Sequence, residues 1–229
     1  VANPHEGKLK PFAEQGTSVT TDNKVAAAVA DIVVLAVKPK VVKGVIDEIK
    51  EELDYSKQTI VNMAASIKLD QLEAWLISGG DVPAICQAIP NIGIAHRQSM
   101  TFLSPNDKAA ANPKPVLDIF NALGKTMVVE EDLLGAGTAM AGCGIAYVLR
   151  FIRAASEAGV ELGFKADDAK NIVLQTIKGA GSLLADGSHP EAEIDKVTTP
   201  GGMTIKGLNT PEANGFTNAV IEGFKGSLK

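Results

Sequence analysis

The stretch Asp31-Ile-Val-Val-Leu-Ala-Val37, followed by Lys38-Pro39, decides how the first half of the chain folds. A continuous apolar run of this length is typical of a strand that is buried on both faces of a parallel sheet. Pro39 ends the strand, because proline has no N–H to donate to a neighbouring strand. We therefore expect a parallel sheet with helices on both faces.

Strands and helices alternate on both sides of this stretch. Residues 40–53 carry apolar side chains at four-residue spacing, which predicts an amphipathic helix. Further strands are predicted at 17–20, 58–64, 82–89, 100–103 and 126–129, and helices at 6–15, 23–30, 69–77 and 116–123. Val1 to His5 is interpreted as the end of one more strand. This alternation predicts a doubly wound, Rossmann-like α/β domain over residues 1–130.

The character of the chain changes after Glu130-Glu131-Asp132. No convincing strand follows, and the apolar spacing predicts helices at 133–162, 167–184, 190–197, 203–209 and 211–226. Residues 131–229 are therefore expected to form an all-helical domain.

Composition limits the classes of function. The chain has 229 residues, of which 45% are hydrophobic and only 4% aromatic, so its core is aliphatic. A net charge of −5 argues against nucleic acid or an anionic membrane as a partner. We expect no apolar run to reach membrane-spanning length. Two cysteines and three histidines, all scattered, predict no metal site, and they fit a protein of the reducing cytoplasm.

The stretch Val197-Thr-Thr-Pro-Gly-Gly-Met-Thr-Ile-Lys-Gly-Leu-Asn209 combines a turn with the start of a helix. The first N–H groups of a helix have no partner within it, and the helix dipole is positive there. Gly201 and Gly202 let a ligand approach the backbone closely, and Thr199 and Thr204 add hydroxyl groups. The stretch is interpreted either as an anion site for a carboxylate or phosphate, or as a plain N-capped turn.

Thr198 to Leu208 resembles the hallmark loop of the pyrroline-5-carboxylate reductase family, and the resemblance covers nearly the whole chain. It implies NADPH- or NADH-dependent reduction of a cyclic imine, 1-pyrroline-5-carboxylate, to L-proline, which is the last step of proline biosynthesis. It also implies that Thr199, Gly201, Gly202, Met203 and Thr204 bind the substrate, whose carboxylate is held by the backbone N–H groups of residues 201–204. In this interpretation Thr204 is the catalytic residue, since its hydroxyl orients the imine nitrogen.

Three strand ends resemble the cofactor-binding segments of the same family. A parallel sheet binds ligands beyond the carboxyl ends of its strands, where small residues let a flat ring lie close to the backbone. The resemblance implies that the nicotinamide end of the cofactor contacts the three segments Ala36-Val37-Lys38-Pro39, Ala64-Ala65 and Pro90-Asn91. Asn23 matches an asparagine on the adenosine side. Asn3 lies after the second strand of such folds, where the side chains distinguish the ribose hydroxyl of NAD from the 2′-phosphate of NADP. The residues present there do not decide between the two cofactors.

The sequence departs from the family pattern at several positions. The Gly-x-Gly-x-x-Gly fingerprint belongs one strand before Asn3, so we expect that one βα unit of the dinucleotide domain is missing from this chain. Gln87 and Ile92 stand where the family leads us to expect Arg and Thr. Ala141, Cys143 and Ile145 replace Ser, Ser and Pro of a family motif, which predicts a smoother helix there.

Two alternative functions stay open at the level of sequence. One is a non-catalytic relative that lacks the glycine-rich cofactor loop. The other is a different NAD(P)-dependent dehydrogenase of the sheet-plus-helices type, but Lys170 and Asn171 are adjacent, which is the wrong spacing for the acid–base pair of that class. The resemblance also implies a homodimer or a larger homo-oligomer built through the helical domain.

Overall fold

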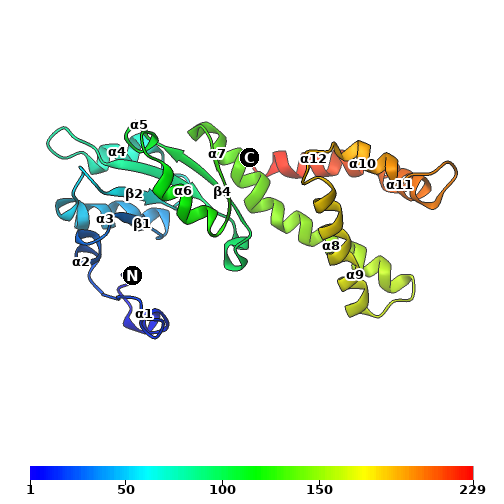
Figure 1. Ribbon diagram of the computed structural model, residues 1–229, viewed down its shortest axis with the longest axis horizontal. Coiled ribbons are helices and arrows are strands. Elements are labelled where there is room, and N and C mark those ends of the chain that lie inside the picture. Colours follow the sequence, from blue (N-terminus) through cyan, green and yellow to red (C-terminus); the bar gives the residue numbers. More distant parts are fainter. Residues whose placement is uncertain (229) are drawn as a thin grey trace. The chain divides into compact units, whose positions relative to one another are not determined.

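The computed structural model describes residues 1–228, and the chain divides into two compact units, Val1–Thr138 and a second that begins at Ala139. The first unit carries one five-stranded sheet in the order β1-β2-β3-β4-β5 (Figure 1). Its strands are β1 (Ile32–Leu35), β2 (Thr59–Asn62), β3 (Ala84–Ile89), β4 (Ser99–Pro105) and β5 (Gly124–Val128).

The sheet is predominantly parallel, as expected, but β4 is reversed. Strands β1, β2 and β3 run parallel, β4 is antiparallel to β3, and β5 is parallel to β4. The connection from β3 to β4 holds only residues 90–98, including the short 3-10 helix η2 (Ile92–His96). A parallel crossover needs a dozen or more residues, so this connection forces the antiparallel pairing.

Helices cover both faces of the sheet. Alternate residues of β2 point in opposite directions, so Ile60 enters one core and Val61 the other. The first core packs against α3 (Pro39–Ile49) and α4 (Leu69–Leu76), and the second against α5 (Asp107–Ala110) and α6 (Lys114–Asn121). This is the doubly wound arrangement that the sequence predicted.

The N-terminal region forms less strand than expected. The helices α1 (Glu6–Ala13) and α2 (Asn23–Ala28) lie where the sequence placed them. The two expected strands beside them are reduced to one isolated bridge between Ala2 and Thr20. β1 is not buried on both faces, because Val34 is 44% exposed. Within residues 1–228, β1 is an edge strand that pairs only with β2.

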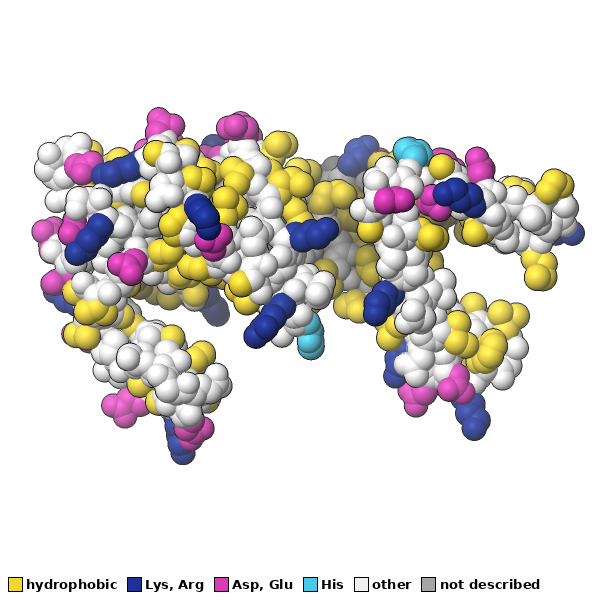
Figure 2. Space-filling view, in the orientation of Figure 1, with side chains coloured by type: hydrophobic (Ala, Val, Ile, Leu, Met, Phe, Trp, Pro, Cys, Tyr) yellow, Lys and Arg dark blue, Asp and Glu magenta, His cyan; other side chains and the backbone are white. Residues whose placement is uncertain are grey.

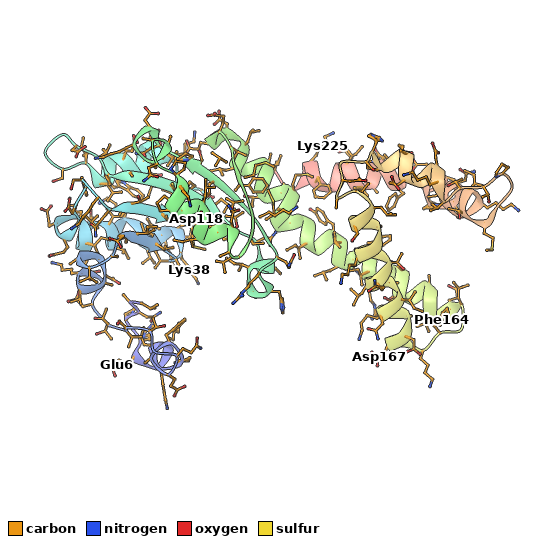
Figure 3. All side chains as sticks on the ribbon, viewed as in Figure 1. Glu6, Lys38, Asp118, Phe164, Asp167 and Lys225 are labelled. Atoms are coloured by element: carbon orange, nitrogen blue, oxygen red, sulfur yellow. The ribbon has the colours of Figure 1, made fainter. Side chains whose placement is uncertain are left out.

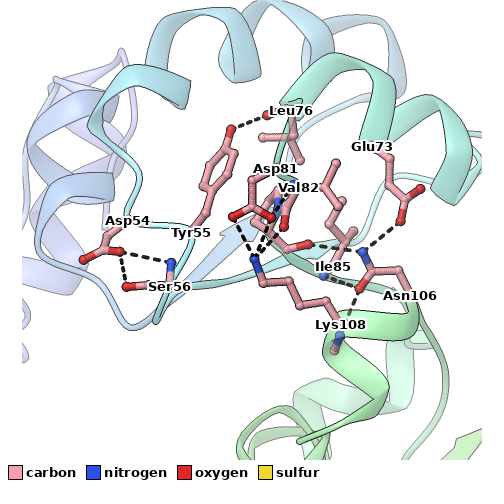
Figure 4. Close-up of polar contacts among 12 residues, drawn as sticks. Asp54, Tyr55, Ser56, Glu73, Leu76, Asp81, Val82, Ile85, Asn106 and Lys108 are labelled. Carbon is pink, nitrogen blue, oxygen red and sulfur yellow. Dashed lines mark hydrogen bonds and ion pairs between the residues drawn. The ribbon is translucent and has the colours of Figure 1, made fainter. Parts of the chain in front are cut away.

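Asn106 joins the amino end of β3 to the β4–α5 corner (Figure 4). Its Oδ1 accepts hydrogen bonds from the N–H groups of Ile85 and Ala109, both at 3.0 Å. Its Nδ2 donates to Glu73 Oε1 at 2.9 Å and to the carbonyl of Pro83 at 3.1 Å. Asn106 therefore stabilises the sheet at the end opposite to the carboxyl ends of β1–β3.

The helical half begins with one continuous helical stretch, as expected for residues 133–162. It comprises the 3-10 helix η3 (Glu131–Leu133), α7 (Leu134–Gly137), a π-helical segment (Thr138–Cys143) and α8 (Gly144–Glu161). The π segment contradicts the prediction of a smoother helix, because one extra residue per turn is inserted there. The remaining helices are α9 (Ala166–Leu183), α10 (Pro190–Lys196), α11 (Met203–Ala213) and α12 (Phe216–Gly226).

The boundary between the last two helices differs from the prediction. The sequence placed a helix start at Pro211, but Pro211 lies in the last turn of α11. The chain breaks instead at Gly215, whose φ of +78° is left-handed and favours glycine. A proline near a helix end removes a single internal hydrogen bond, so α11 continues through it for two more residues.

The helical unit has close helix contacts but almost no core of its own. Gly159 lies against Ala169, so α8 and α9 approach closely, and Tyr147 stacks edge-on against Phe224 of α12 with ring centroids 5.0 Å apart. Only Ala139, Gly144 and Ala169 are buried within residues 139–228. Figure 2 shows apolar side chains exposed along these helices, including the tip of the α8–α9 hairpin where Figure 3 labels Phe164.

The helical segment Glu131–Glu161 is long and apolar enough to cross a membrane by length and composition. Its best window has a mean hydropathy of 1.4, and 22% of that window is buried. The expectation that no segment reaches this length is therefore wrong. A helix that packs against a second subunit has the same length and composition, so these two properties alone assign no membrane.

Candidate functional site

The carboxyl ends of β1, β2 and β3 meet at one edge of the sheet. Leu35, Asn62 and Gln87 are cross-strand partners, so the segments that follow them leave the sheet side by side. These segments are 36–39, 63–66 and 90–91, and we call their common edge the strand-end edge. It brings together eight of the ten residues assigned to the cofactor from sequence: Ala36, Val37, Lys38, Pro39, Ala64, Ala65, Pro90 and Asn91.

The first segment of this edge leads directly into a helix. Lys38 is the N-cap of α3 with extended backbone angles, and Pro39 is the first helical residue. Proline suits this position, because its fixed φ is helical and its missing N–H would have no partner there. Ala36 to Pro39 are all exposed, and the Lys38 side chain is visible beside the sheet in Figure 3. The segment is therefore accessible to a ligand.

The second segment is held from beneath by two buried amide side chains. Asn62 and Gln87 are 0% and 2% exposed, and Nδ2 of Asn62 donates to Oε1 of Gln87 at 2.8 Å. Both side chains also donate to the carbonyl oxygen of Ala64, each at 2.9 Å. The N–H of Ala64 donates back to Oδ1 of Asn62 at 3.2 Å. We call Asn62 and Gln87 the amide pair.

The third segment is held by a buried hydroxyl group. Oγ of Ser99, at the start of β4, accepts a hydrogen bond from the N–H of Asn91 at 3.1 Å. The same hydroxyl lies 3.0 Å from Oγ1 of Thr101, which is fully buried. Oδ1 of Asn91 accepts from the N–H of Gly93 and so caps η2. The reversed strand β4 thus fixes the end of β3.

Asn3 and Asn23 do not belong to the strand-end edge. Oδ1 of Asn3 accepts a hydrogen bond from the N–H of His5 at 3.0 Å, just before α1. Asn23 is the first residue of α2, and its Nδ2 donates to Oε2 of Glu48 at 2.8 Å. Their roles on the adenosine side of a cofactor stay predictions.

The other candidate site is the N-terminus of α11, in the helical unit. Gly202 is its N-cap, and no side chain within residues 1–228 caps the helix there. The N–H groups of Met203 and Thr204, in the first turn, have no partner within the helix. Thr199, Gly201 and Met203 are exposed, with Met203 at 91%. An eleven-residue helix with an open N-terminus suits an anionic group.

Both glycines of this turn are required by its geometry. Gly201 has φ +69°, which disfavours any residue with a Cβ. A Cβ on Gly202 would collide with Oγ1 of Thr199 and would lie 3.1 Å from the Thr199 carbonyl oxygen. The N–H of Gly202 donates to that same carbonyl at 3.0 Å. The turn therefore brings the Thr199 hydroxyl against the backbone just before the first turn of α11.

Sequence reasoning missed the residues that support these segments. Asn62 and Ser99 were not singled out, and Gln87 was noted only as a departure from a family pattern. One signal was available for Asn62 and Gln87, because each is a polar strand residue with an apolar neighbour on either side, whereas Ser99 follows Gln98 and carries no such signal. A buried polar side chain must find hydrogen-bond partners, so such positions point to specific contacts.

The chemistry available at the two sites is mainly hydrogen-bond donation. The strand-end edge presents small and apolar side chains, one lysine and exposed backbone, which suits the face of a flat ring. The N-terminus of α11 presents backbone N–H groups and two threonine hydroxyls, which suits a carboxylate. Lys170, the acid–base candidate of the rival dehydrogenase class, bonds instead to Oδ1 of Asp167 at 2.9 Å, and this contact lowers the pKa of Asp167.

Two family models match the chain. One is described as pyrroline-5-carboxylate reductase dimerisation and matches residues 131–229. The other is described as NADP oxidoreductase, coenzyme F420-dependent, and matches residues 1–66. The matched ranges correspond to the helical half and to the start of the sheet unit.

Curated relatives carry the same family name. Pyrroline-5-carboxylate reductase 2 of Dictyostelium discoideum is 37% identical over 92% of this chain and 74% of its own length. Pyrroline-5-carboxylate reductase of Methanosarcina acetivorans is 33% identical over 91% of this chain and 78% of its own length. Pyrroline-5-carboxylate reductase 1 of Dictyostelium discoideum is 41% identical, and the chain spans 41% of the length of that relative.

Solved structures agree with the fold. A pyrroline-5-carboxylate reductase from Coxiella burnetii matches all of this chain and 85% of its own, with a TM-score of 0.92 at 29% identity. A pyrroline carboxylate reductase from Plasmodium falciparum with NADP bound matches 93% of this chain and 80% of its own, with a TM-score of 0.81 at 29% identity. The Rossmann-like fold class expected from sequence is confirmed.

Proposed function

The chain belongs to the pyrroline-5-carboxylate reductase family, and on this premise we propose that it reduces 1-pyrroline-5-carboxylate to L-proline. Relatives of that name at 33–37% identity, matched over most of their own length, support the proposal. The single structural observation that carries it is the open N-terminus of α11 with its two required glycines. The product and the substrate share one carboxylate, which such a helix N-terminus can bind.

The substrate carboxylate is bound by the N–H groups in the first turn of α11. Gly201 and Gly202 keep the approach to these N–H groups free of side chains, and the helix dipole adds a favourable charge interaction. Thr199 holds its hydroxyl beside Gly202. The exposed side chain of Met203 adds an apolar contact for the ring.

Thr204 orients the ring nitrogen. Its hydroxyl can accept a hydrogen bond from a protonated imine, and it follows directly after the proposed carboxylate-binding N–H of Met203. A protonated imine is already electrophilic, so the site needs no strong acid. Catalysis by these residues is then mostly a matter of position, which is a large effect when the reacting atoms are correctly placed.

The strand-end edge is the proposed contact for NADPH or NADH. When bound, the nicotinamide ring supplies the hydride. The residues fit this group, because the small exposed side chains of Ala36 and Ala65 leave room for a flat ring and the Ala65 N–H is unpaired within residues 1–228. The NADP-bound relative from Plasmodium falciparum supports NADPH as the cofactor.

The helical unit is the proposed dimerisation surface. The match to a dimerisation family model supports this, as does the near absence of buried residues within 139–228. Helices that expose this much apolar surface are stable when they pack against another surface. A second copy of the chain provides that surface, and neither nucleic acid nor a membrane is needed. Two free cysteines, one of them buried, support a cytoplasmic location.

One assay tests the proposed function. The full-length protein is mixed with NADPH and 1-pyrroline-5-carboxylate, nicotinamide oxidation is followed by absorbance, and L-proline is measured by mass spectrometry. We expect one proline per NADPH consumed, and no consumption without the imine. Cofactor binding without turnover of this imine would favour another substrate, and no binding of either nucleotide would favour a non-catalytic relative.

A further inference from the structure

The amide pair lies directly beneath the strand-end edge, and its hydrogen bonds determine which way one peptide group points. Two donors, Nδ2 of Asn62 and Nε2 of Gln87, converge on the carbonyl oxygen of Ala64 at 2.9 Å each. This carbonyl therefore points into the protein, and Ala64 itself is buried.

The next N–H must point the other way. The peptide bond between Ala64 and Ala65 is planar and trans, since no cis peptide bond occurs within the described residues, so its N–H is opposed to its C=O. The Ala65 N–H is thereby directed outward, at an exposed residue of the strand-end edge. It has no hydrogen-bond partner within residues 1–228. An outward donor of this kind suits a carbonyl or phosphate oxygen of a ligand.

The rest of the turn agrees with this arrangement. Ser66 adopts a left-handed φ of +67°, which returns the chain to the protein so that Ile67 is buried. A left-handed residue other than glycine persists only where its surroundings determine it. The amide pair on one side and Ile67 on the other supply those surroundings.

We propose that the Asn62–Gln87 amide pair is a positioning device for the cofactor, which fixes the Ala64 carbonyl inward and so presents the Ala65 N–H to the nicotinamide half of the nucleotide. This inference rests on the proposed function. Gln87 acts through Ala64 rather than by touching a ligand, because its side chain is buried and bonded to Asn62 and Ala64. Both polar atoms of the Gln87 side chain therefore have hydrogen-bond partners inside the protein, Oε1 with Asn62 and Nε2 with the Ala64 carbonyl.

The chain contains a matched control for this proposal. Gln58 is also 2% exposed, and its Nε2 donates to the carbonyl oxygens of Ala27 and Ala30 at 2.8 and 2.5 Å. It immediately precedes β2, so it lies at the opposite end of the strand that leads to Ala64. Gln58→Met and Gln87→Met thus remove the same buried amide at the two ends of the sheet.

The test compares these two variants in the full-length protein. Thermal unfolding measures stability, calorimetry measures the Kd for NADPH, and steady-state kinetics give the KM for NADPH and for the imine. We expect both variants to lose stability, but only Gln87→Met to weaken NADPH binding, by about tenfold, as expected for loss of one well-placed hydrogen bond. The KM for the imine stays within about twofold of wild type in both, a negligible difference in free energy.

Several outcomes separate the possibilities. If Gln87→Met does not fold, the pair Asn62→Leu with Gln87→Met removes both amides together, which is expected to be better tolerated than leaving one unpaired. NADPH binding that is equal in the Gln87 and Gln58 variants overturns the positioning role and leaves the proposed function standing. A wild-type protein that neither binds NADPH nor reduces the imine overturns the proposed function, and the positioning role falls with it.

Discussion

Ser66 carries the least favourable backbone conformation at the strand-end edge. Its φ of +67° brings the side chain close to its own backbone, a strain that glycine does not have. We predict that Ser66→Gly raises the free energy of unfolding by about 1 kcal/mol, measured by thermal or denaturant unfolding. Ser182→Gly, in the last turn of α9, is the control and should not raise it, because glycine gains nothing in a right-handed helical conformation. A lower melting temperature for Ser66→Gly would contradict this account of the turn.

Cys86 lies in the sheet next to Gln87, and burial raises the pKa of its thiol from 9.0 to about 11. The raised pKa means that the folded state keeps the thiol neutral where the unfolded state ionises it. Its contribution to stability is therefore complete below pH 9 and is lost as the pH rises toward 11.

A Cys143→Ser variant isolates this thiol for measurement. We predict that Cys86 resists a thiol reagent at pH 8 in the folded protein and reacts completely after denaturation, since only the accessible thiolate is nucleophilic. The free energy of unfolding should fall between pH 8 and pH 10.5, and this fall should be larger in Cys143→Ser than in a variant that also carries Cys86→Ala. Rapid labelling of native Cys143→Ser would show that Cys86 is not buried as described.

At the scale of elements, the sequence predicted the helices and strands that have a clear apolar period. The amphipathic helix α3 and the buried strands β2 and β3 lie close to their predicted bounds. Direction and pairing were not predictable in the same way, because the reversal of β4 depends on the length of one connection. Within residues 1–228, β1 lies at the edge of the sheet with Val34 exposed. The helix boundary at Pro211 was also predicted wrongly, because a proline in the last turn of a helix does not end that helix.

In the candidate sites, too, local features were predictable from the sequence and contacts between distant residues were not. The N-terminus of α11 was predictable, because the Pro-Gly-Gly turn and the helix pattern are local features. The amide pair was not, because Asn62 and Gln87 are 25 residues apart and meet only through strand register. Contacts of this kind depend on how strands align, which a single sequence does not state.

Thr204 is in the first turn of α11, and its hydroxyl is proposed to orient the substrate nitrogen. We predict that Thr204→Ala lowers kcat by about tenfold with little change in melting temperature, because position rather than binding is lost. Thr210→Ala is the control: Thr210 lies on the same helix and its hydroxyl donates to the Lys206 carbonyl at 3.1 Å. Steady-state kinetics with saturating NADPH measure both variants. Undiminished activity in Thr204→Ala would remove this residue from the mechanism.

At the scale of the whole molecule, the helical unit exposes apolar side chains that a second copy of the chain would cover. Leu149 and Phe151 on α8 are 55% and 49% exposed in a unit with only three buried residues among 139–228. We predict a dimer or larger assembly for the wild type at micromolar concentration, measured by light scattering after size exclusion. Paired Leu149→Glu and Phe151→Glu substitutions should reduce the measured mass, because charges in an apolar interface are costly.

The matched control for the interface is Arg150→Glu, an exposed position between the two apolar residues that is already charged. This variant should keep the mass of the wild type. A wild-type protein that elutes with the mass of one chain would contradict dimerisation through the helical unit.

The central claim is that the N-terminus of α11 binds the substrate carboxylate on its backbone N–H groups. The most direct measurement compares Gly202→Ala with Gly207→Ala by the KM that each variant shows for the imine substrate. A Cβ at Gly202 meets Thr199 and obstructs the turn, whereas one at Gly207, four residues further along α11 from Met203, meets nothing within 4 Å. The account predicts that this KM rises at least about tenfold in Gly202→Ala and is unchanged in Gly207→Ala, because a charge-assisted hydrogen bond is lost in only one of them. Equal KM values in the two variants would contradict it.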